Sequence, residues 1–190
     1  MAKPKIKISK NNVEQTIDLE DLFGVSFKGA PALKEAIGQK IIDRIVQRTE
    51  AGDSMTFNSK GDGRVGKLKK PYSKSYVDST EFKAHGKSKN KVNMKLTGDM
   101  LGLLDIKKQS GDSITIGWNK GDGQDAKAFN HSTGDTVPKR PFFGVNKKEL
   151  DRIKKGFKSE VKEALSIKKD EGKSAFNKFV LGLIKEVDED

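Results

Sequence analysis

The sequence predicts an α+β fold in which a small antiparallel sheet is packed by two long amphipathic helices, with a long basic loop and a C-terminal helical extension. Two apolar stripes with helical spacing predict the helices, and stretches of alternating apolar and polar residues predict the sheet. With 190 residues, 33% of them hydrophobic and 34% charged, the chain is long enough for one domain with a core. We therefore expect a single domain over residues 1–165 and a helical extension over residues 166–190.

The first element is expected to be a hairpin. Apolar residues alternate with polar ones in residues 5–9 and 15–19, and a polar turn separates the two stretches. The apolar members are Ile6, Ile8, Ile17 and Leu19. Because alternate residues of a strand face the same side, this pattern predicts a small hairpin with one buried face.

A long helix is expected from Pro31 to about Ala51. Proline suits the first helical position, and Gly52 is a typical helix end. An apolar residue recurs at every fourth position, at Leu33, Ile37, Ile41 and Ile45. One face of this helix must therefore be covered by a sheet or by another helix.

Residues 53–95 are rich in glycine, lysine and serine and predict a long basic loop, with one short helix within residues 72–82. Eleven basic and three acidic residues lie between residues 60 and 95, a net charge of +8 out of +11 for the chain. Such a segment attracts phosphate and equally suits an acidic protein partner, or it is a solvated lysine-rich surface. The lysines expected to face DNA or an acidic partner are Lys67, Lys69, Lys70, Lys87, Lys89 and Lys91.

A compact apolar module follows this loop. Thr97 is expected to cap a short turn that carries Met100, Leu101 and Leu104. A polar turn at residues 110–112 then leads into a strand with Ile114, Ile116 and Trp118 on one face. Residues 125–134 are predicted to form a helix that ends at Gly134, with His131 in a structural role near its end.

Residues 137–146, which we call the arm, begin with a segment that two prolines make rigid and end with residues typical of a helix N-terminus. Pro138 and Pro141 fix the backbone, and Asn146 is a predicted N-cap with Glu149 as its capping-box partner. The second long helix is therefore expected from Asn146 to about residue 165. Alternation along an extended arm predicts Phe143 inside and Arg140 and Phe142 outside, in an assembly contact, or the same alternation with the two faces reversed. The alternative is that the arm only anchors the helix onto the core. A third apolar stripe over residues 175–187, with an acidic end, predicts a C-terminal helix.

The sequence gives little support for an enzyme, a cofactor or a metal site. Residues 61–67 have the glycine spacing of a phosphate loop, but Lys69, Lys70 and Pro71 follow where such a loop must open a helix. His85 and His131 are the only histidines, and no cysteine is present. The longest apolar run has six residues, so we expect no membrane segment and assembly in the cytoplasm.

Several segments in order resemble the phage virion morphogenesis family, the tail completion proteins of tailed bacteriophages. They are Pro71-Tyr72-Ser73, Leu96-Thr97-Gly98, the strand ending at Trp118, residues 125–134 with His131, and Arg140-Pro141-Phe142-Phe143-Gly144. The resemblance covers about residues 54–165. The family usually has tyrosine where this chain has Phe129.

The resemblance implies a structural subunit of the phage head–tail junction that joins the tail to the connector, is not an enzyme and needs no cofactor. It implies a homo-oligomeric ring, a hexamer in preference to a dodecamer, in contact with other neck, connector and tail tube or terminator proteins and with packaged DNA in its lumen. The protein would be assembled in the bacterial cytoplasm and located in the virion. The interface residues implied are Leu96, Thr97, Gly98, Arg140, Pro141, Phe142 and Phe143. The alternative function is a nonspecific nucleic-acid-binding protein without a virion role.

Overall fold

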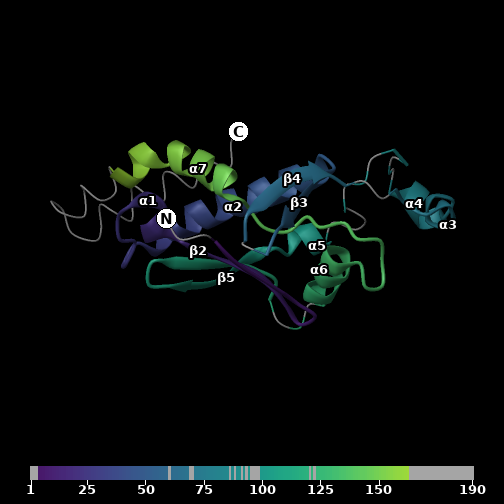
Figure 1. Ribbon diagram of the computed structural model, residues 1–190, viewed down its shortest axis with the longest axis horizontal. Helices are drawn as coiled ribbons and strands as arrows, with labels where there is room; N and C mark the ends of the chain where they lie inside the picture. The colour runs from purple at the N-terminus through teal and green to yellow at the C-terminus, as the bar shows by residue number, and fades with distance from the viewer. Residues whose placement is uncertain are drawn as a thin grey trace.

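The computed structural model describes residues 4–59, 61–68, 71–85, 87, 89–90, 92, 94, 99–119, 121 and 123–162. The predicted C-terminal helix and the predicted Thr97 cap lie outside these residues. The elements in chain order are β1 (Lys5–Ser9), β2 (Asn12–Asp18), α1 (Leu19–Phe23), α2 (Pro31–Glu50), β3 (Asp53–Phe57), β4 (Gly63–Lys67), α3 (Lys74–Val77), α4 (Thr80–Ala84), α5 (Asp99–Gly102), β5 (Asp105–Ser110), β6 (Ser113–Gly117), α6 (Gln124–Thr133) and α7 (Lys147–Gly156). The predicted α+β class is confirmed (Figure 1).

The central layer is a four-stranded antiparallel sheet with the strand order β1-β2-β6-β5. Its two inner strands, β2 and β6, pair Ile17 with Ile114 and Gln15 with Ile116. The isoleucines of these pairs are almost completely buried. The predicted amino-terminal hairpin and the predicted 110–112 turn are therefore confirmed, and the two hairpins meet along β2 and β6. Leu19 begins α1 and does not extend the strand.

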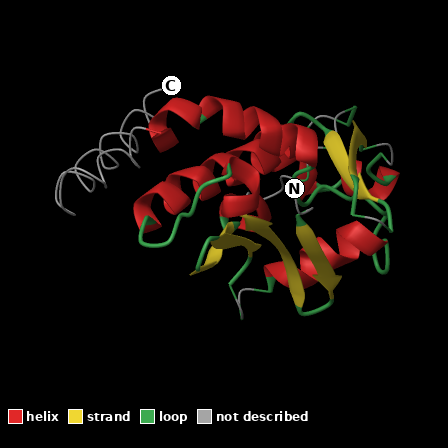
Figure 2. Ribbon diagram, turned by 60° about the vertical axis from the view of Figure 1, so that its left-hand side comes forward, coloured by secondary structure: helices red, strands yellow, loops and turns green. Residues whose placement is uncertain are grey.

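Helix α2 packs directly on this sheet, against β5 and β6. A Cβ atom on Gly38 would lie only 2.3 Å from Cδ1 of Ile106, so glycine allows the helix to approach β5 closely. Helix α7 lies beside α2 and contacts α1 and α2 (Figure 2). The two long helices were both expected on the sheet, but α7 reaches it mainly through α1 and α2.

The predicted long basic loop is wrong in its first part, because residues 53–57 and 63–67 form the two strands of a hairpin, β3 and β4. Met55 pairs with Val65 across this two-stranded sheet, and Met55 is its fully buried side chain. The turn is closed by a hydrogen bond from the Asn58 N–H to the Asp62 carbonyl, 3.1 Å long. The glycine-rich residues 61–67 are thus a turn and a strand, and no helix opens there to receive a phosphate.

Two short helices replace the single one predicted within residues 72–82. Ser73 caps α3 and Ser79 caps α4, each by accepting a hydrogen bond from a backbone N–H three residues on. Figure 1 shows α3 and α4 at one end of the molecule, beyond the β3–β4 hairpin.

The expectation that Phe142 faces outward is wrong, because both phenylalanines of the arm are buried. Phe142 is 0% exposed and Phe143 is 2% exposed. Their ring centroids lie 6.2 Å and 5.2 Å from that of Trp118. The alternation rule assumes a strand with one free side, whereas this arm has neighbours on both sides.

We predict that Phe142→Ala and Phe143→Ala each lower the free energy of unfolding by about 3–5 kcal/mol, as large-to-small changes in a core do. Chemical denaturation measures this loss. Leu103→Ala is the matched control, because Leu103 is 48% exposed and its truncation should change stability by less than about 0.5 kcal/mol. A Phe142→Ala protein as stable as the parent would contradict the buried position of this ring.

Candidate assembly site formed by the arm and the basic segment

The arm is hydrogen-bonded on both sides along its length. On one side, the Met55 N–H of β3 donates to the Pro141 carbonyl at 2.9 Å. On the other, the Arg140 N–H donates to the His131 carbonyl at 2.7 Å, and the Gln15 amide makes two bonds to the Val145 backbone. An extended segment with such partners is part of the interior.

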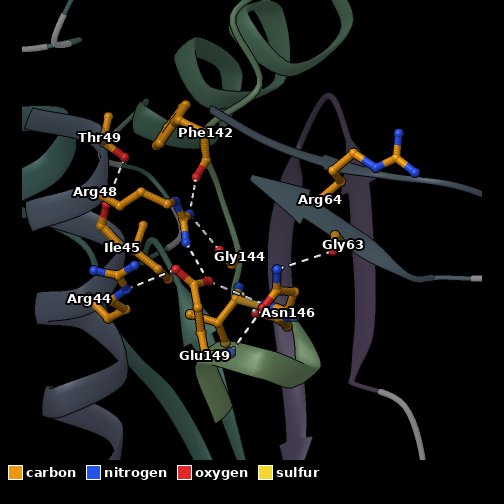
Figure 3. Close-up of polar contacts among 12 residues, drawn as sticks. Arg44, Ile45, Arg48, Thr49, Gly63, Arg64, Phe142, Gly144, Asn146 and Glu149 are labelled. Carbon is orange, nitrogen blue, oxygen red and sulfur yellow. Dashed lines mark hydrogen bonds and ion pairs between the residues drawn. The ribbon is translucent and has the colours of Figure 1, made fainter. Parts of the chain in front are cut away.

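A buried arginine of α2 holds the carbonyl groups of the arm (Figure 3). The Arg48 Nη2 atom donates to the carbonyl oxygens of Phe142 and Gly144, both at 2.6 Å. Its Nη1 atom donates to Glu149 Oε2 at 2.7 Å. Burial lowers the pKa of Arg48, while Glu149 opposes that shift. A guanidinium stays protonated in proteins, so this buried charge is compensated by Glu149 and two carbonyl dipoles.

Glu149 connects this arginine to the start of α7. The predicted capping box is present: the Glu149 N–H donates to Asn146 Oδ1 at 3.0 Å, and the Glu149 carboxylate accepts from the Asn146 N–H at 3.4 Å. Arg44 Nε donates to the second carboxylate oxygen at 2.8 Å. The Asn146 side chain also donates to the Gly63 carbonyl of β4 at 3.1 Å. One carboxylate therefore joins α2, the arm and α7.

Gly144 gives the arm its bend. Its φ of +94° lies in the left-handed region, and a Cβ atom there would lie 3.0 Å from the Phe57 ring. This turn brings the Gly144 carbonyl to Arg48 together with that of Phe142. Other residues would be strained at this position.

The expectation that Arg140 faces outward is also wrong, because its side chain is 6% exposed and joins the arm to the basic segment. Its Nη2 atom donates to the Pro71 carbonyl at 2.8 Å, and its guanidinium lies 5.1 Å from the centroid of the Tyr72 ring. Lys87 Nζ lies 4.9 Å from the same centroid. Cations near an aromatic face are attracted to it. The structure thus brings together one residue of the predicted interface and one of the predicted lysines.

The basic segment has its own small aromatic cluster. Tyr72, Tyr76 and Phe82 pack against one another with centroids 5.2–5.4 Å apart. Phe82 is buried, and the two tyrosines are half-buried. The rings are therefore occupied with each other and with the two cations, which leaves little free face for stacking on bases.

The other predicted site residues are not gathered in one place. Lys67 is exposed and pairs with Asp53, and Lys89 is exposed. Arg64 points away from the Arg48 cluster into solvent (Figure 3). The predicted residues outside the described part of the chain are Leu96, Thr97, Gly98, Lys69, Lys70 and Lys91.

Sequence reasoning missed Arg48, although a signal for it was present. Arg48 follows Ile41 and Ile45 at helical spacing, so an arginine occupies a place in the apolar stripe of α2. A charged residue in such a stripe is rarely buried unless it is paired. Gln15 gives a weaker signal of the same kind, because a polar residue stands between Val13 and Ile17 on the apolar face of a strand. Its side chain is 0% exposed.

His131 has an unusual environment beside Arg140. Burial, and to a smaller extent the positive charge of Arg140, lowers the pKa of His131 to about 4. The ring is therefore neutral at pH 7. In an unfolded chain the pKa of histidine is about 6.5, so the unfolded state takes up a proton first as the pH falls.

No group of three potential metal ligands occurs among the described residues. Within the same residues, no helix is long and apolar enough to cross a membrane. The chain matches no protein-family model, and no curated protein and no solved structure is significantly similar to it.

We predict that Arg48→Met lowers the free energy of unfolding by about 3–5 kcal/mol, because Glu149 and two arm carbonyls lose their partner inside the protein. Arg44→Met is the matched control, because the Arg44 side chain is 37% exposed and its bond to the same carboxylate should contribute less than about 1 kcal/mol. Urea unfolding at pH 7 compares the two. Equal losses of unfolding free energy in the two variants would mean that the buried Arg48 contributes no more to stability than the more exposed Arg44.

We also predict a pH dependence that is due to His131. The stability that its neutral ring contributes is complete above about pH 6.5 and is lost as the pH falls toward 4. From pH 7.5 to pH 5, the parent should therefore lose on the order of 1 kcal/mol more than His131→Gln. His85→Gln is the control, since His85 is the other histidine of the chain and is exposed. Parallel curves for the parent and His131→Gln would refute this role.

Proposed function

We propose that this chain is a structural subunit of the phage head–tail junction, a tail completion or neck protein that forms a ring and joins the tail to the connector. One observation carries the proposal: segments that resemble the tail completion family, far apart in the sequence, pack together around Arg140. The Arg140 guanidinium contacts Pro71 and Tyr72, and its backbone contacts His131. The next residues of the arm pack on Trp118. Residues that pack together in one place are the ones that related proteins are expected to have in common.

The mechanism we propose for this function is geometric. A ring that transmits a fixed spacing between tail and connector needs stiff subunits, and the buried Arg48–Glu149 pair and the arm provide that stiffness. Lysines of α3, α4 and the residues after them would form a band around the ring. That band would face packaged DNA by nonspecific phosphate contacts, or an acidic ring of another neck protein.

A nonspecific nucleic-acid-binding protein is the second candidate, and the charge of +11 favours it. The aromatic cluster argues against strand binding by base stacking, because its rings are packed on each other. This candidate therefore depends on lysine–phosphate contacts alone. An enzymatic function lacks support from any cluster of catalytic groups among the described residues.

We predict that a phage lacking this gene accumulates unjoined heads and tails, and that the purified parent protein restores joined particles. Arg140→Ala should fold but restore joining poorly, because the basic segment loses its connection to the arm. The neighbouring Lys139→Ala is the matched control, since Lys139 is exposed and should restore joining fully. Electron microscopy of lysates counts the joined particles.

Normal joining without the gene, with the protein absent from purified virions, would refute the proposed function. If the purified protein then bound DNA without sequence preference and lost affinity steeply with salt, the second candidate would be correct.

A further inference from the structure

An open groove with a volume of about 730 Å³ lies between α2 and α5. Apolar side chains form its floor, among them Ile42, Val46 and Leu101. Leu103, at its rim, is 48% exposed, the highest exposed fraction among the large hydrophobic residues that the structure describes. A groove with an exposed leucine suits a contact with another protein surface.

The groove is acidic in a strongly basic chain. Asp43, Glu50 and Asp105 line it, and none of its described lining residues is Lys, Arg or His. Within the described part of the chain, Asp43 accepts a hydrogen bond from Gln39, and Asp105 from the N–H of Ile106, but neither is in an ion pair. Asp43 and Asp105 therefore offer negative charge to the groove that no ion pair within the described part of the chain neutralises.

The complementary surface is the basic projection, which we define as the described residues of 71–90 with α3 and α4. Lys74, Lys83 and Lys89 are exposed on it, and its four described lysines stand against two acidic residues, Asp78 and Glu81, a net charge of +2. Figure 1 shows α3 and α4 at one end of the molecule, and no residue of the projection lines the groove. A contact between the two surfaces must therefore be made between two copies of the chain.

We infer that the acidic groove between α2 and α5 receives the basic projection of a second copy. The two surfaces are different patches, so the contact is heterologous, and a pair of copies retains one free groove and one free projection. Such a contact generates a ring if the rotation between copies closes. The inference rests on the proposed function for its ring geometry, but the contact is testable on the purified protein alone.

The test reverses each charged surface separately in the full chain. Asp43→Lys with Asp105→Lys makes the groove basic, and Lys74→Glu with Lys83→Glu makes the projection acidic. Each double variant alone brings like charges together, so its self-association at low salt should weaken by about tenfold or more. Glu20→Lys with Asp135→Lys is the matched control for the groove, because both residues are exposed outside it.

Mixing the two double variants gives the decisive result. In the mixture every groove meets a projection of opposite charge, so sedimentation velocity should show assembly restored to within about threefold of the parent. The far-ultraviolet circular dichroism of each variant should equal that of the parent, which excludes unfolding as the cause. Self-association of both double variants at the parental strength, or a mixture that stays dissociated, would overturn the inference.

A parent protein that stays monomeric at every concentration would also overturn the inference, because the groove would then not bind a second copy of the chain. The joining experiment on phage reads the proposed function independently. If the protein joins tails to heads but its groove variants assemble like the parent, the proposed function stands and the inferred contact is wrong.

Discussion

The structure depends on one buried guanidinium, that of Arg48. Its desolvation is costly, and Glu149 together with the carbonyls of Phe142 and Gly144 compensates that cost. The same Glu149 caps α7, and α7 packs on α2, which carries the arginine. Removing the guanidinium would therefore take the Arg48 donor from two buried carbonyls and leave Glu149 with Arg44 as its basic partner, a cost that apolar packing at position 48 could not offset.

The position of the arm follows from this interaction and determines which surfaces remain for assembly. With both phenylalanines packed on Trp118, the arm contributes no apolar side chain from this pair to a partner. In the proposed assembly its contribution would be indirect, because Arg140 contacts Tyr72 at the start of the basic projection. The surfaces that we propose for partners are the exposed lysines of that projection and the groove beside Leu103.

Much of the fold could be predicted because its signals are local. The helix from Pro31, the capping box at Asn146 and the strand with Ile114 and Ile116 were all predicted from spacing within a few residues. The β3–β4 hairpin was missed because it buries only one large side chain fully, Met55, and contains glycines that are rare in strands.

The predicted orientation of Phe142 was wrong for a different reason, because it depends on β3 and α2, which lie far from it in the sequence. The most direct test of the account is hydrogen exchange measured by NMR on the arm amides of Arg140 and Val145. If the arm is part of the interior, both amides exchange with a free energy close to that of global unfolding, as the β6 amides do. Exchange of both at the rate of exposed loop amides would contradict the account.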